Sequence, residues 1–180
     1  SRPHSELTVM DVACPTTSPF SAQLAATSAG AQRELLEIPF CRAAVAGALS
    51  RAEYVAFLTQ AYHHVKHTVP LLMAAGAAAG PERRDLQDAF VEYVAEERGH
   101  DLWILDDIAA SGGDAAAVRD GRPDHAAEVM VAYAYDAIAR QGPVAFLGMV
   151  HVLEGTSVVA ASRAAAALGP RLDLPASAFT

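Results

Sequence analysis

Residues 86–108 read Leu86-Gln-Asp-Ala-Phe-Val-Glu-Tyr-Val-Ala-Glu-Glu-Arg-Gly-His-Asp-Leu-Trp-Ile-Leu-Asp-Asp-Ile108 and carry the apolar spacing of a long helix. Apolar residues recur every three or four positions, as on the buried face of an amphipathic helix. Glu97 takes a place in this apolar stripe, and His100 follows three residues later. Positions three apart share one helix face, so we expect this carboxylate and this imidazole to point at the same place between packed helices.

A second pair, His151 and Glu154, interrupts the most apolar segment of the chain, residues 144–168. A buried carboxylate destabilises the fold by several kcal/mol unless a cation or hydrogen-bond donors compensate it, on the order given for desolvated charges. The chain has one lysine, so a metal ion is an attractive compensator. We therefore predict that Glu97, His100 and Glu154 converge on one interior point as metal ligands.

Other interpretations of these residues stay open. His151 is a candidate fourth ligand, but a single His in an apolar helix is also typical of a core residue with one satisfied hydrogen bond. Glu97 could instead belong to a solvated charge run with Glu96 and Arg98. Asp101, beside His100, is a candidate acceptor for an imidazole N–H of a metal ligand.

Three histidines, His63, His64 and His67, form a further cluster near the end of a helix that begins at the Ser50-Arg-Ala-Glu53 capping box. Pro70 cannot donate to the carbonyl four residues earlier, so we expect a kink in this helix just after the histidines. At least one of the three could bind a cofactor or metal, and all three could equally be exposed.

The composition predicts one soluble, all-α domain. At 180 residues and 52% hydrophobic, the chain can bury a sizeable core. A Pro-, Ser- and Thr-containing arm is expected over 1–19 and a single bundle over 20–180. The net charge of −8, with no dense basic cluster, argues against a nucleic-acid or anionic-membrane partner. Two dispersed cysteines favour a reduced, cytoplasmic protein. The helices expected in the bundle span 20–37, 39–49, 50 to beyond 70, 82–110, 125–140 and 144–168.

Four stretches resemble one known family when they are taken together. They are Gly47-Ala-Leu-Ser-Arg-Ala-Glu-Tyr-Val-Ala-Phe-Leu58, Gln60-Ala-Tyr-His-His-Val-Lys-His-Thr-Val-Pro70, Glu96-Glu-Arg-Gly-His-Asp-Leu-Trp-Ile-Leu105 and Gly148-Met-Val-His-Val-Leu-Glu-Gly-Thr-Ser157. From about Pro39 onward, the chain looks like the heme-oxygenase-like, TenA-like (thiaminase-II-like) helical superfamily. Within it, the chain is most similar to the iron-containing redox enzymes, the heme-oxygenase-like diiron oxidases and oxygenases.

The resemblance implies a helical bundle that holds two non-heme irons and activates O₂. It places Glu97, His100 and Glu154 among the iron ligands, and it loosely places a further ligand near His63 to His67. It implies a small carboxylic acid or amino acid as substrate, and it is compatible with a homodimer and an external electron donor.

The family's third ligand helix follows a Leu-Pro turn, which matches Leu174-Pro-Ala-Ser-Ala-Phe-Thr180 at the end of this sequence. The C-terminal ligand helix is therefore absent from these 180 residues, and we expect the polypeptide to continue and to supply the remaining His and Asp ligands. Two rival functions stay open. One is a heme-binding oxygenase with His63, His64 or His67 as axial ligand. The other is a metal-free binding protein whose Glu97 and Glu154 contact Arg or Tyr side chains.

Overall fold

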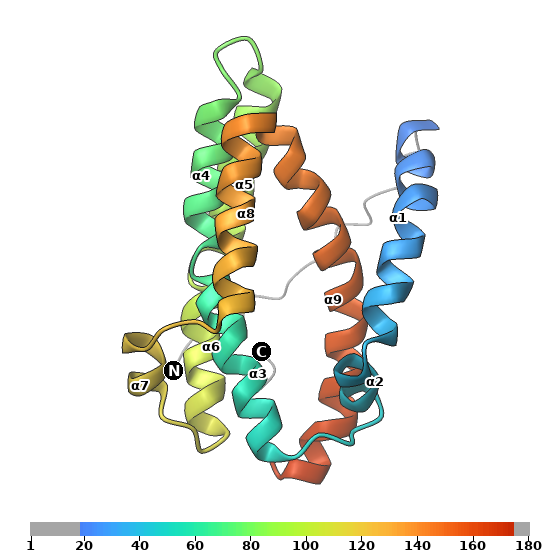
Figure 1. Cartoon of the computed structure of the whole chain (residues 1–180), viewed down its shortest axis with the longest axis vertical. Helices are drawn as coiled ribbons and strands as arrows, with labels where there is room; N and C mark the ends of the chain where they lie inside the picture. Colours follow the sequence, from blue (N-terminus) through green and yellow to red (C-terminus); the bar gives the residue numbers. More distant parts are fainter. Residues whose placement is uncertain (1–18, 175–180) are drawn as a thin grey trace, which may run out of the picture.

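The computed structural model describes residues 19–174, and this part of the chain is helical with no strand, as predicted (Figure 1). The elements are α1 (Pro19–Glu37), α2 (Pro39–Val45), α3 (Arg51–Val65), α4 (Thr68–Ala78), α5 (Arg84–Glu97), α6 (His100–Ala110), α7 (Ala115–Asp120), α8 (His125–Gln141) and α9 (Pro143–Leu172). Pro19 begins α1. The rest of the expected N-terminal arm, and the end of the chain from residue 175, lie outside the described residues.

The helix that starts at the capping box is broken rather than kinked. Ser50 and Glu53 form the predicted box, in which each side chain accepts from the other's backbone N–H. The helix ends at Val65, and α4 starts at Thr68. Pro70 is the third residue of α4. The N–H groups of the first helical turn have no intrahelical acceptor, so a proline there loses no helical hydrogen bond. The expected kink is therefore a full break, because the chain restarts a helix there instead of bending through it.

The segment expected as one helix over 82–110 is also broken. It divides into α5 and α6 at Arg98 and Gly99. Arg98 is extended, and Gly99 has φ 101°, a left-handed conformation that glycine adopts without strain. The prediction of a continuous helix was wrong because a single glycine in an amphipathic pattern does not reveal whether the helix tolerates it or stops at it.

The two breaks lie at the same level of the bundle. α4 packs mainly on α5, and α3 packs mainly on α6, so the broken segments run antiparallel side by side (Figure 1). One core cluster lies on each side of the breaks. The first comprises Leu49, Tyr54, Leu58, Tyr62, Leu105, Ile108 and Leu168. The second comprises Leu71, Leu72, Ala75, Phe90, Ala134, Ile138 and Phe146. The helix break in each segment therefore lies between the two apolar core clusters.

The long helix α9 crosses the molecule obliquely, away from α3 and α6 over much of its length (Figure 1). Its main contacts are with α8, α1, α2 and α4. By length and composition it is apolar enough to span a membrane, a property that core helices of bundles share, yet only 12% of its most apolar window is buried. Much of its apolar surface is therefore uncovered in the described part of the chain.

One short helix was not anticipated. The region between Ser111 and Pro123 was expected to be a loop, but it contains α7. Asp114 starts this helix, since its carboxylate accepts from the backbone N–H of Ala117 at 2.9 Å. A one-and-a-half-turn helix carries too few residues to show a period in sequence.

Candidate functional site

Glu97 and His100 are in contact, as predicted, although they belong to different helices. Glu97 is the last residue of α5 and His100 the first of α6. His100 Nδ1 and Glu97 Oε2 are 2.9 Å apart, and the side chains are 32% and 17% exposed respectively. Because a carboxylate only accepts, Nδ1–H is the donor, and in the neutral imidazole the lone pair is then on Nε2. A carboxylate that orients an imidazole through one nitrogen prepares the other for a metal ion.

The surroundings of His100 differ from the prediction in one respect. Asp101 was expected to accept an imidazole N–H, but Glu97 has that role in the structure. The imidazole ring also lies against Trp103, with ring centroids 4.4 Å apart. The carboxylate and the indole therefore fix the orientation of His100 between them.

The three histidines of the first break have reduced basicity. His63 is buried, and its burial together with the charge of Lys66 lowers its pKa. Burial also lowers the pKa of His64 and, with a smaller contribution from Lys66, that of His67. The surroundings of all three imidazoles therefore favour the neutral form.

All three imidazoles already have polar partners, and that of His64 is hydrogen-bonded to the backbone of Gln60. Lys66 Nζ is 3.2 Å from His63 Nδ1. Since an ammonium only donates, the proton of neutral His63 resides on Nε2 and its one lone pair is taken. His67 Nδ1 lies 3.3 Å from the hydroxyl of Tyr135 on α8. This arrangement disfavours His63 as an axial heme ligand or as a metal ligand.

The pair on α9 does not join the other candidates. His151 Nε2 lies 3.0 Å from Ser28 Oγ on α1, which is the core interaction considered from sequence. Glu154 is exposed, though partial burial raises its pKa. Across residues 19–174, no group of three or more His, Cys, Asp or Glu side chains is close enough to hold a metal ion. The predicted convergence of Glu97, His100 and Glu154 is therefore not found, because α9 packs chiefly on α1, α2, α4 and α8.

Tyr93 was assigned to the core from its position in the sequence, and the structure adds a polar feature. It packs against the second core cluster one helical turn before Glu97. Its hydroxyl is buried, with no hydrogen-bond partner among the described residues. An unsatisfied buried hydroxyl destabilises a fold by about 1–3 kcal/mol. Such an atom beside a candidate ligand pair is a potential donor to a bound molecule.

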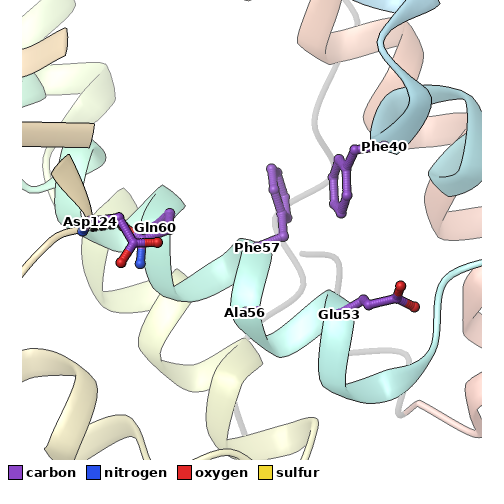
Figure 2. Close-up of a pocket in the computed structure, with 6 residues that line it drawn as sticks. All are labelled: Phe40, Glu53, Ala56, Phe57, Gln60 and Asp124. Atoms are coloured by element: carbon purple, nitrogen blue, oxygen red, sulfur yellow. Dashed lines mark hydrogen bonds between the residues drawn. The ribbon is translucent and has the colours of Figure 1, made fainter. Parts of the chain in front are cut away.

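A surface cavity of about 370 Å³ lies between α2, α3 and the start of α8 (Figure 2). Phe40 and Phe57 stack across it with ring centroids 5.1 Å apart, and the Asp124 backbone N–H donates to Gln60 Oε1 at 2.8 Å. Figure 2 shows Glu53 directed away from this stack, toward the capping box. No predicted ligand lines the cavity, so it belongs to a different part of the molecule from the Glu97–His100 pair.

The arrangement is a helical protein with a carboxylate-oriented histidine at paired helix breaks. The family model described as "Iron-containing redox enzyme" matches residues 55–180, and the chain belongs to that family. A crystal structure from Shewanella denitrificans OS217, of a domain of unknown function with a heme oxygenase-like fold, is also similar. It shares 26% identity over 88% of this chain and 68% of that chain, with a TM-score of 0.77. No curated protein matches.

These findings confirm the family and the heme-oxygenase-like fold expected from the sequence. The matched region contains Glu97, His100 and Glu154. The donor set fits an iron ion only in part. Glu97 and His100 offer oxygen and nitrogen donors side by side, whereas the described residues bring no third donor to them.

Proposed function

We propose that this protein is an iron-dependent oxidoreductase that uses O₂ to oxidise a small carboxylic acid or amino acid. Membership of the iron-containing redox family supports the reaction class. The observation that carries the proposal is the contact between Glu97 and His100, which leaves an imidazole lone pair oriented and available. Desaturation, C–C cleavage, decarboxylation and N-oxygenation all belong to this class of reaction.

In this proposal His100 would hold iron through Nε2, while Glu97 orients the imidazole through Nδ1. Iron, when bound, would mediate electron transfer to O₂ from the substrate and from an external donor. Two non-heme irons would require ligands beyond Glu97 and His100.

The test is iron retention. The chain is loaded anaerobically with Fe(II), desalted and analysed for metal, beside His100→Gln, Glu97→Gln and the control Glu92→Gln, an exposed carboxylate on the same helix. We expect His100→Gln to lose most of the iron, Glu97→Gln to lose about tenfold in affinity or more, and Glu92→Gln to match the wild type. Equal retention in all four proteins would refute the assignment.

Hemin provides the counter-test. A Soret band that appears with hemin and disappears on replacing His64 or His67 would establish the heme-binding rival instead. We expect no such band, because the His63 lone pair is occupied by Lys66 and His67 contacts Tyr135.

A further inference from the structure

The sequence contains one lysine, Lys66, and the fold places it at the break between α3 and α4. Its side chain is half-buried, and no carboxylate of residues 19–174 lies within ion-pair distance of Nζ. Acidic side chains outnumber Lys and Arg by 21 to 13, so an ammonium without an acidic partner is unexpected here. A charge drawn partly out of water is stabilised by an opposite charge or by hydrogen bonds.

The hydrogen bonds of Lys66 are incomplete. An ammonium carries three N–H donors. Nζ donates one to His63 Nδ1 at 3.2 Å, and it lies 5.2 Å from the centre of the Tyr62 ring. Within the described part of the chain, these are the polar and cation–π contacts of the ammonium. Two donors therefore remain for a further acceptor.

The groups around Lys66 suit a singly charged anion. The Nδ1 lone pair of His63 faces Lys66, so this imidazole adds no second positive charge at the Lys66 side chain. No arginine side chain of the described residues contacts Lys66, His63 or His67, whereas sites for phosphate commonly add an arginine fork. A lysine at a helix C-terminus also interacts favourably with the helix dipole. That explanation accounts for the position of Lys66 but not for its two remaining donors.

The position of Lys66 in the fold links it to the candidate iron site. The break that carries Lys66 and the break that carries Glu97 and His100 lie at the same level of two antiparallel segments. An anion held at the first break would therefore lie close to the second. The carboxylate of a small acid, once anchored there, would be presented to the Glu97–His100 level of the bundle.

We propose that Lys66 is the anchor for the carboxylate of the substrate, which it binds at the break between α3 and α4 with the neutral imidazole of His63 beside it. The role in oxidation rests on the proposed function. The binding itself does not, since it needs no iron.

Because Lys66 is the only lysine in the sequence, it can be observed directly. Selective ¹³C,¹⁵N-lysine labelling marks this one side chain, and its ¹³Cε and ¹⁵Nζ chemical shifts report on the ammonium without altering its three N–H donors. The metal-free full chain is titrated with acetate, butyrate and alanine, and in parallel with butylammonium and inorganic phosphate. We expect a saturable shift of the Lys66 signal with at least one carboxylate and none with butylammonium. An unmoved signal, or tighter binding of phosphate than of any carboxylate, would overturn the proposal.

Variants separate binding from a structural role. Lys66→Met removes the charge and retains the chain length, Lys66→Arg restores a charge, and Arg84→Met removes a charge at an exposed control position. By calorimetry in 0.15 M salt, we expect Lys66→Met to bind the carboxylate about tenfold more weakly or worse, from the loss of a charged hydrogen bond. We expect Lys66→Arg to recover part of the affinity and Arg84→Met to match the wild type.

Two results would contradict this. Equal weakening by Lys66→Met and Arg84→Met would show an effect of net charge alone. Undiminished binding in a folded Lys66→Met protein would exclude the anchor. If Lys66→Met fails to fold, the ¹³C titration of the unmutated chain still decides the question. If the protein binds the carboxylate but does not retain iron, the proposed function is refuted and the binding role of Lys66 stands.

Discussion

The imidazole of His100 stays 2.9 Å from the carboxylate of Glu97 across a break between two helices. In a continuous helix, the two residues would be held together by their spacing of three. Here the helix is interrupted at Gly99, which is left-handed with φ 101°, and His100 still contacts the last residue of α5. The geometry of the candidate iron ligands thus depends on a backbone conformation that favours glycine.

Replacing Gly99 with alanine should therefore destabilise the protein and disturb the candidate site. No atom lies within 4 Å of a Cβ built at Gly99, so the cost is conformational, about 1–2 kcal/mol. Gly30, inside α1, is the matched control because it also has open space around it and normal helical geometry. Gly30→Ala should stabilise by about 0.5–1 kcal/mol. Urea unfolding measures both, and a harmless Gly99→Ala would show that Gly99 is not held left-handed in solution.

Two tyrosines of the second core cluster should respond in opposite ways to loss of the hydroxyl. The Tyr93 hydroxyl has no partner among the described residues, whereas that of Tyr135 contacts His67. Tyr93→Phe should leave stability unchanged or raise it by up to about 1 kcal/mol, because it removes an unsatisfied group. Tyr135→Phe should cost about 1 kcal/mol, since it removes the partner of His67. Thermal unfolding of the metal-free protein compares them, and a destabilised Tyr93→Phe would reveal a hydrogen bond that the hydroxyl makes in solution.

The sequence predicted the helical elements well where local signals were strong. The capping box at Ser50 and Glu53 and the Gly142-Pro143 start of α9 both lie where expected. It did not reveal that Pro70 and Gly99 mark breaks. Each residue is compatible with a bent helix, and the choice is made by the packing of two antiparallel segments on separate cores.

The candidate site was predictable only in its local part. Residues three apart were expected to share one face of a continuous helix, and the structure brings Glu97 and His100 into contact across a helix break instead. The place of Glu154 depends on the rotation of α9 about its axis, which is fixed by long-range contacts with other helices, such as that of Ser28 with His151. Those contacts leave no periodic signal in either helix. Lys66 was visible as the sole lysine, but its lack of an acidic partner required the structure.

His63 should be locked in one tautomer. Lys66 donates to Nδ1, so the proton of the neutral imidazole should be on Nε2. Nitrogen-15 chemical shifts from long-range ¹H–¹⁵N correlation spectra at pH 7 distinguish the two ring nitrogens directly. His63 should also become protonated only at a lower pH than an ordinary histidine, because burial and the charge of Lys66 lower its pKa. A protonated Nδ1 at pH 7 would show that the Lys66 contact is not maintained in solution.

Asp107 should make the stability of the protein depend on pH. Burial, and then the negative charge of Asp106, raise its pKa to about 6 from an ordinary value of 3.8. Between these values the folded state binds more protons than the unfolded state, so the contribution of Asp107 to stability falls as the pH rises. The ionised Asp107 carboxylate destabilises the folded state fully above about pH 6 and no longer does so below about pH 4.

Asp107→Asn removes the charge in both states and should stabilise the protein at pH 7.5 by about 1 kcal/mol after allowance for solvent screening. The gain should shrink toward zero near pH 4 in urea titrations. Asp88→Asn, at an exposed position, is the control and should show no such dependence. An equal gain for Asp107→Asn at both pH values would instead point to improved packing, because only a charge effect follows the titration of the carboxyl group.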